Sequence, residues 1–96
     1  FPTSDQADDA QFMIGESYFA AKKDAEAVAA YGEVTKRYPT GNAAPDAFYK
    51  RGLAMERMGN LDGARDSWQQ AVKAHAETDA GRLAKQGLDR LAARKP

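Results

Sequence analysis

The sequence predicts an all-α fold of stacked helical hairpins, and two observations predict it. The first is an internal repeat, because a shift of 37 residues places Gly52 under Gly15 and Tyr38-Pro39 under Phe1-Pro2. The second is the spacing of apolar residues, which recur every three or four positions without the alternation of a strand. One hairpin cannot bury its apolar face alone. We therefore expect the hairpins to stack and to offer a concave surface to another protein.

The first hairpin is predicted over residues 4–41. Its first helix is expected over about residues 4–21, with Ser4 or Asp5 as the N-terminal cap. We expect Asp24 to cap the second helix, which carries apolar residues at helical spacing and ends at a Pro-Thr-Gly-Asn turn.

The second hairpin is predicted over residues 42–77. Its first helix runs from about Pro45, a residue that suits the first turn of a helix, to Met58. The dipeptide Gly59-Asn60 then predicts a left-handed ending. We expect Asp62 to open the second helix of this hairpin.

A fifth helix is predicted over residues 78–94, opening at Thr78 or Asp79. Its outer face is polar, as the end of a stacked array requires, and we interpret it as a capping helix. That polar face consists of Lys85, Gln86, Arg90 and Arg94. Residues 1–96 are thus expected to form one domain. Because Phe1-Pro2 aligns with the end of a hairpin, we expect the domain to be excised from a longer chain.

Composition and chemistry argue against an enzyme. The chain has 14 basic and 14 acidic residues and no cysteine, so its charge does not favour nucleic acid, and no apolar run is long enough to enter a bilayer. The only histidine, His75, has no second ligand at helical spacing. We interpret the pair Asp8-Asp9 as stabilising a helix dipole. We expect no catalytic residue, metal or cofactor.

The repeated positions resemble those of the tetratricopeptide repeat, a unit of two antiparallel helices. The resemblance implies a right-handed superhelical stack of two hairpins plus the capping helix. It also implies that small and large residues pack the two helices of each hairpin together. These packing residues are Gly15, Tyr18, Ala27 and Tyr31 in the first hairpin, and Gly52, Met55, Ala64 and Trp68 in the second. Ile14 is expected to face the core beside Gly15 and Tyr18.

A narrower resemblance concerns the segments at the two hairpin starts. The runs Phe1-Pro2-Thr3-Ser4 and Tyr38-Pro39-Thr40, with Ala7-Asp8-Asp9-Ala10 and Ala44-Pro45-Asp46-Ala47, resemble the C-terminal domain of the Tol-Pal-associated periplasmic protein family, also called YbgF or CpoB. This resemblance implies a periplasmic module that binds the TolA protein and coordinates outer-membrane constriction with septal peptidoglycan synthesis in cell division. It also implies an upstream coiled coil through which the full-length protein forms a homo-oligomer.

In the repeat family the first helix of each hairpin lines the concave surface. Residues at i, i+4 and i+7 share one face of a helix, so Phe12, Glu16 and Phe19 form one stripe. The 37-residue shift carries this stripe to Tyr49, Leu53 and Glu56. These six residues are the candidate groove for a partner segment, and large apolar side chains there favour an apolar anchor.

Three alternatives to this interpretation stay open. Phe12 and Phe19 are as well explained by an absent upstream helix that they once faced, in which case the chain associates weakly with itself through its first helix. The repeats also suit a scaffold of another envelope complex related to BamD, or a purely structural array. A clamp for a C-terminal carboxylate is disfavoured, because Phe12, Glu16, Tyr49 and Leu53 stand where that mechanism needs basic and amide side chains.

Overall fold

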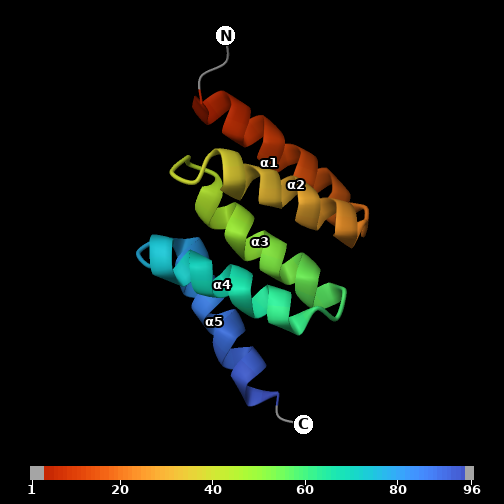
Figure 1. Ribbon diagram of the computed structural model, residues 1–96, viewed down its shortest axis with the longest axis vertical. Helices are drawn as coiled ribbons and strands as arrows, with labels where there is room; N and C mark the ends of the chain where they lie inside the picture. The colour runs from red at the N-terminus through yellow and green to blue at the C-terminus, as the bar shows by residue number, and fades with distance from the viewer. Residues whose placement is uncertain (1–3, 95–96) are drawn as a thin grey trace.

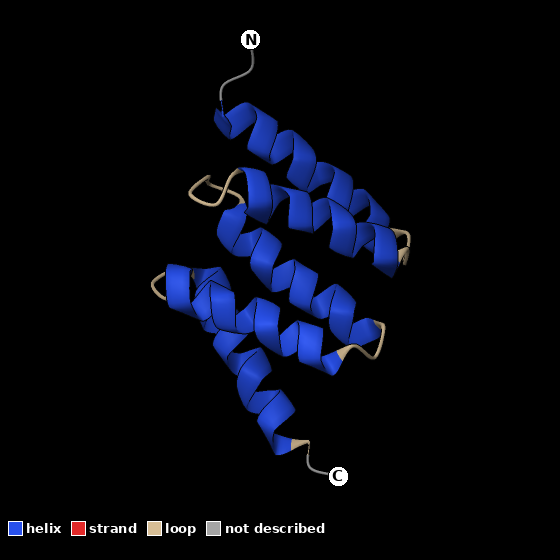
Figure 2. Cartoon of the chain, in the orientation of Figure 1, coloured by secondary structure: helices blue, strands red, loops and turns tan. Residues whose placement is uncertain are grey.

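A computed structural model of the protein describes residues 4–94 and contains five α-helices joined by short turns (Figures 1 and 2). The helices are α1 (Ser4–Ala20), α2 (Asp24–Arg37), α3 (Ala44–Arg57), α4 (Leu61–His75) and α5 (Asp79–Ala93). No strand occurs in this part of the chain, so the predicted all-α fold is confirmed. Phe1-Pro2 and the side chains of Ser4 and Asp5, on which an excised end and the first cap were predicted, lie outside the described residues.

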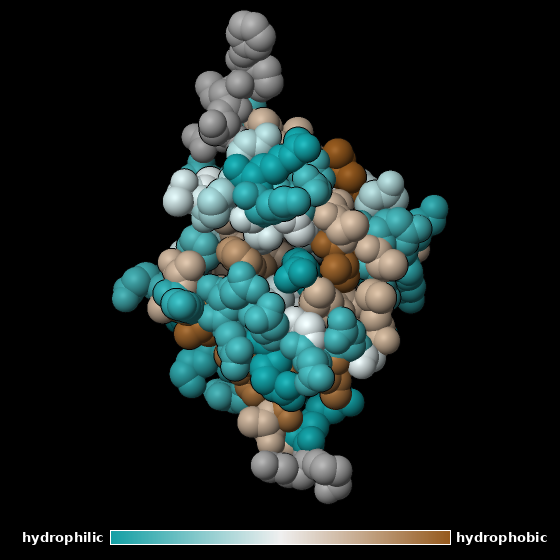
Figure 3. All heavy atoms as spheres, in the orientation of Figure 1, coloured by the Kyte–Doolittle hydropathy of each residue, from teal (hydrophilic) through white to brown (hydrophobic). Residues whose placement is uncertain are grey.

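The helices form an elongated stack of two layers, 50 Å long and 17 Å thick, with α1 and α5 at opposite ends of it (Figure 1). α2 packs against α1 and α3, and α4 packs against α3 and α5, whereas no contact joins α2 to α4. α1, α3 and α5 therefore lie side by side in one layer, which carries the candidate groove. Hydrophilic side chains cover much of the face shown in Figure 3. Among the described helices, none is both long and apolar enough to cross a membrane.

Two helix boundaries have the geometry expected from the sequence, and two others differ from the expectation. Gly59 has a φ of +81°, as the predicted left-handed ending requires. Thr78 accepts a hydrogen bond from the backbone N–H of Gly81 at 3.0 Å and so caps α5 as expected. α4, however, begins one residue before Asp62 and is capped by Asn60. Asp24 is not a cap either, because Lys23 holds the cap position and no side chain caps α2 there.

Each hairpin closes where a glycine of its first helix meets an aromatic ring of its second. A Cβ atom on Gly15 would lie 2.6 Å from the Tyr31 ring, and one on Gly52 would overlap the indole of Trp68. Both rings are fully buried. Burial of side chains of this size contributes roughly 2–3 kcal/mol each to stability. The predicted packing by small residues against large aromatic ones is therefore found in both hairpins.

Hydrogen bonds fix the register of each hairpin. The Trp68 indole N–H donates to the carbonyl of Tyr49 at 3.0 Å, and the Ser67 hydroxyl donates to the carbonyl of Phe48 at 2.7 Å. In the first hairpin, the Gln11 amide donates to the carbonyl of Ala30 at 3.1 Å. These bonds satisfy side-chain donors between paired helices, where an unpaired polar group would cost about 1–3 kcal/mol.

Two residues expected in the core face outward instead. Ile14 is 48% exposed and Tyr18 is 36% exposed, so the expectation that they pack inside the first hairpin is wrong. Met55, which stands 37 residues after Tyr18, is only 9% exposed. The reason is tertiary: α2 packs against α3, whereas no described helix packs on the corresponding side of α1.

The side chain of Asp8 forms a hydrogen bond between the two hairpins, which the residues around it in the sequence do not predict. Its carboxylate is fully buried and accepts a hydrogen bond from the backbone N–H of Ala43 at 2.9 Å. Ala43 is the residue that precedes α3, so an α1 side chain satisfies a donor at the start of α3. The interpretation of Asp8 as a group that acts on its own helix dipole is therefore wrong.

The buried residue Tyr31 also carries a titratable hydroxyl group. Its hydroxyl donates a hydrogen bond to the carboxylate of Glu16. Burial, the hydrogen bond and the charge of Glu16 all raise the pKa of Tyr31 above its usual range, while Arg57 opposes the shift. The folded state therefore keeps this proton at alkaline pH, where the unfolded chain releases it.

The first prediction concerns the small residue Ala64, which is fully buried in the second hairpin. Replacing Ala64 with Leu should destabilise the fold by about 1–3 kcal/mol, because the close contact has no room for added methylene groups. Thermal unfolding followed by circular dichroism measures this. Ala74→Leu is the matched control, since Ala74 is exposed on the same helix. An unchanged midpoint for Ala64→Leu would refute the helix pairing described above.

The second prediction concerns alkaline pH. Stability from the raised pKa of Tyr31 is present below about pH 10, the usual tyrosine pKa, and is lost as the pH rises beyond it. Urea unfolding at pH 8 and pH 11 should therefore show a smaller loss of stability for Tyr31→Phe than for the parent. Tyr18→Phe, at an exposed position, should lose as much as the parent does. Equal losses in all three proteins would show that Tyr31 does not contribute.

Candidate protein-binding face

The six predicted groove residues lie on the layer formed by α1, α3 and α5. We call this surface the α1–α3–α5 face, and its predicted members are Phe12, Glu16, Phe19, Tyr49, Leu53 and Glu56. All six are partly buried, and none is fully exposed or fully enclosed. Their side chains are therefore held in place by neighbours while part of each remains accessible.

At the junction of α1 and α3, cations of α3 cover the α1 stripe. The Arg57 guanidinium lies 3.8 Å from the centre of the Phe19 ring and donates a hydrogen bond to the carbonyl of Phe19 at 2.9 Å. Arg57 also pairs with Asp24, which explains why that carboxylate is not a cap. Lys50 lies 3.5 Å from the carboxylate of Glu16. In the first stripe, the Phe19 ring and the Glu16 carboxylate therefore lie beneath two basic side chains of α3.

Basic side chains also cover the second stripe, at the junction of α3 and α5. Arg90 and Arg94 reach back to the carboxylate of Glu56 at 2.8 and 3.7 Å. Arg94 stands 37 residues after Arg57, and Glu56 stands 37 residues after Phe19, so the cation and its target both follow the repeat. The guanidinium of Arg90 also lies 5.5 Å from the centre of the Trp68 ring.

The positions of Arg90 and Arg94 differ from the positions expected for them. They were expected on the outer polar face of the capping helix, but they turn toward α3 and border the candidate face. Sequence analysis assigned no cation to this face. The sequence could have indicated these contacts, because Arg94 follows Arg57, and Glu56 follows Phe19, by the same 37 residues that separate the two stripes.

Tyr49 and Leu53 form the apolar middle of the face. The Tyr49 ring stacks on Trp68 with ring centres 6.5 Å apart, and both Tyr49 and Leu53 pack against the core of the second hairpin. Phe12 lies against Tyr31 with ring centres 5.6 Å apart. Phe12 and Phe19 pack on the core of the first hairpin, so they do not face the uncovered side of α1.

The ion pairs on this face are exposed to solvent. Arg57, Arg90 and Arg94 remain 37%, 51% and 55% exposed, so solvent screens their ion pairs and each pair contributes about 0–1 kcal/mol. An incoming carboxylate therefore meets basic groups whose present pairing is weak. Tyr49 and Leu53 offer a firm apolar surface beside these groups.

The described part of the chain contains no cluster of side chains suited to a metal ion. Among residues 4–94, no three histidine or acidic side chains lie together as a metal ion would require. The His75 ring packs beside Phe48 at 5.9 Å, which is a packing contact.

Comparison with known proteins gives one family. The tetratricopeptide repeat model matches residues 9–41 and again residues 46–78. No curated protein matches the chain significantly. The two matched segments span α1 with α2 and α3 with α4, the two hairpins described above. Repeats of this kind are protein–protein interaction modules. Because the matches cover more than half of the sequence, the chain belongs to the tetratricopeptide repeat family.

Proposed function

We propose that this interaction module belongs to the bacterial cell envelope and holds a segment of a TolA-like protein on the α1–α3–α5 face. One observation carries the choice of face: half-buried apolar side chains lie there, and exposed basic groups border them at both helix junctions. A partner segment that lies along the face meets an apolar surface and cations at regular intervals.

The apolar part of the interaction rests on Tyr49 and Leu53. Both side chains pack against the core of the second hairpin, so little side-chain entropy is lost when a partner covers them. Aromatic residues in such positions are common hot spots of binding, where truncation costs about 2 kcal/mol or more. Phe12 and Phe19 extend the same surface toward α1.

The charged part of the interaction rests on Arg57, Arg90 and Arg94. The side chains of these arginines are 37%, 51% and 55% exposed, so solvent screens their present ion pairs, and we infer that each guanidinium can also pair with a carboxylate supplied by the partner. This favours a partner segment that carries acidic residues next to its apolar anchor.

The assignment to the cell envelope rests on resemblance. The Tyr38-Pro39-Thr40 and Ala44-Pro45-Asp46-Ala47 segments resemble those of the Tol-Pal-associated periplasmic family, and the proposed periplasmic location and TolA-like partner come from that resemblance. Cell fractionation of the full-length gene product tests the location. Homo-oligomerisation of that product through an upstream coiled coil is part of the same proposal.

The third prediction tests the face. The double variant Tyr49→Ala and Leu53→Ala should lose more than about tenfold in affinity for the partner domain of TolA, measured by calorimetry, since two apolar anchors are removed. Because Tyr49 stacks on Trp68, binding is measured at a temperature where circular dichroism shows the parent helicity. Met58→Ala is the control, as Met58 is 50% exposed and lies outside the face.

Two results would contradict the proposal, and they differ in what they reject. Parent-like affinity of the folded double variant would place the binding site on another surface. Failure of the parent chain itself to bind the TolA domain would reject the envelope assignment, while the face would remain open to test with acidic, apolar peptides.

A further inference from the structure

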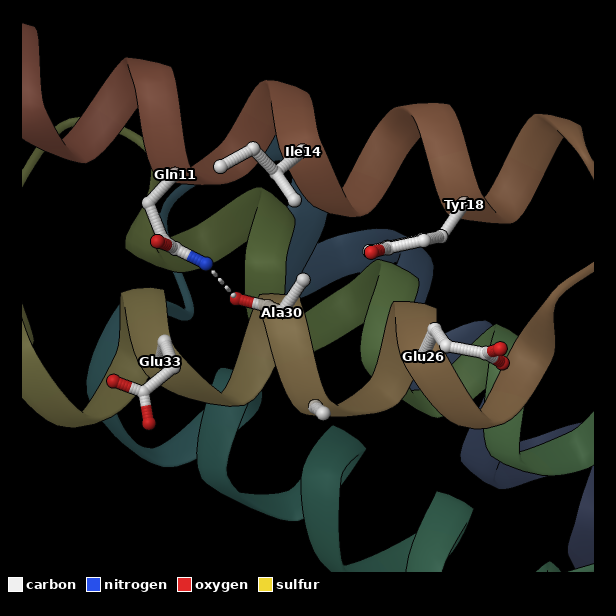
Figure 4. A pocket seen from close by; sticks show the side chains of 7 residues that line it. Gln11, Ile14, Tyr18, Glu26, Ala30 and Glu33 are labelled. Carbon is white, nitrogen blue, oxygen red and sulfur yellow. Dashed lines mark hydrogen bonds between the residues drawn. The ribbon is translucent and has the colours of Figure 1, made fainter.

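A shallow apolar groove lies between α1 and α2, away from the α1–α3–α5 face. It encloses about 300 Å³. Gln11, Ile14 and Tyr18 line it from α1, and Glu26, Ala29, Ala30 and Glu33 line it from α2 (Figure 4). In Figure 4 the remaining helices lie behind this pair, so the groove opens on the side turned away from α3. Two of the large exposed hydrophobic residues of the described chain, Ile14 and Tyr18, are in it.

The second hairpin shows what covers the corresponding surface. The α3 stripe consists of Ala47, Arg51 and Ala54, and the α1 stripe consists of Ala10, Ile14 and Ser17, each 37 residues earlier. α2 lies across the α3 stripe, where Ala47 and Ala54 are fully buried and Gly32 approaches Arg51. All three residues of the α1 stripe are exposed. The packing of α2 on the α3 stripe is therefore an example, within this fold, of a helix that covers such a surface.

The uncovered stripe is more apolar at its centre than the covered one. Ile14 stands where the α3 stripe has Arg51. Ala10 and Ser17 are small, so a helix can approach α1 as closely as α2 approaches α3. The exposed surface of α5 differs, because most of its exposed side chains are polar and Leu83 is the large apolar exception. Exposed apolar surface of this kind marks an interaction site.

The charges at the groove restrict which helix fits. Glu26 and Glu33 stand seven residues apart on α2, and Figure 4 shows them on either side of Ala30. Their counterparts in the second hairpin, Gly63 and Gln70, are uncharged. Glu33 pairs with Arg37 at 3.0 Å but its side chain stays 42% exposed. The edge of the groove is therefore acidic, and it favours basic residues in an occupant.

We propose that this groove binds an amphipathic α-helix of a partner protein. The helix lies across α1 as α2 lies across α3, with a stripe of small apolar residues against Ile14 and Tyr18. Lysine or arginine residues beside that stripe meet Glu26 and Glu33. This is a second surface, independent of the α1–α3–α5 face, so the domain can hold two partner segments at once.

Two synthetic helical peptides with capped ends test the proposal against the 96-residue chain. Both carry valine and glycine four residues apart, the pattern of Val28 and Gly32 on α2, and they differ only in whether lysine or glutamate flanks the stripe. Backbone amide shifts in an NMR titration report the site and the affinity. We expect shifts at the groove residues, and binding of the lysine peptide at least tenfold tighter than that of the glutamate peptide.

Variants of the chain then assign the contacts. Ile14→Lys with Tyr18→Lys should weaken binding of the lysine peptide at least tenfold, and both positions are exposed, so the fold should tolerate the changes. Glu26→Lys with Glu33→Lys should reverse the preference between the two peptides. Leu83→Lys is the control, because Leu83 is 41% exposed on α5, far from the groove, and should leave binding unchanged.

Three results would overturn the proposal. The first is the absence of groove shifts with either peptide. The second is parent-like binding by the Ile14→Lys and Tyr18→Lys variant. The third is a dimer of the parent chain in sedimentation, without peptide, that the same variant abolishes, since the occupant would then be a second copy of this chain. That last result would support the self-association expected from the sequence, through Ile14 and Tyr18 in place of Phe12 and Phe19.

Discussion

The contact between an aromatic ring and a glycine on the facing helix is the constraint on which the rest of the structure depends. Trp68 shows it most fully, because its ring lies against Gly52 on α3 and against Gly87 on α5. A side chain at either glycine would push the helices apart and lengthen the stack. The close approach also brings the Trp68 N–H to the carbonyl of Tyr49, and the Tyr49 ring, which belongs to the candidate face, stacks on Trp68. The packing of the second hairpin therefore supports a residue of the proposed site.

The sequence predicted most of the fold, because the period of a helical repeat is set by local packing. Gly15 with Tyr31 and Gly52 with Trp68 recur at the same spacing, and each pair is a contact within one hairpin. The prediction failed for Tyr18 because its surroundings differ from those of Met55. Met55 lies in the core of the second hairpin, against which Val28 of α2 also packs, whereas no described helix packs on the corresponding side of α1.

The candidate face was predicted in part. Helical periodicity placed the six stripe residues on α1 and α3, since it depends only on the backbone of each helix. It did not reveal the basic side chains above them. Arg57 and Arg94 have long, flexible side chains that reach from α3 to α1 and from the end of α5 to α3, so their targets depend on the distance between helices. Asp8 was misinterpreted for the same reason, because its partner Ala43 lies 35 residues away.

The buried carboxylate of Asp8 has a consequence for how the stack opens. In an array of repeats, each hairpin touches only its neighbours, and local unfolding ordinarily starts at the ends. Here α1 supplies the hydrogen-bond acceptor for the backbone N–H of Ala43, directly before α3. When α1 detaches, that N–H loses its partner and the first turn of α3 loses support. We therefore expect amide hydrogens at the start of α3 to exchange with solvent when α1 detaches, so that opening of the first helix is coupled to the second hairpin.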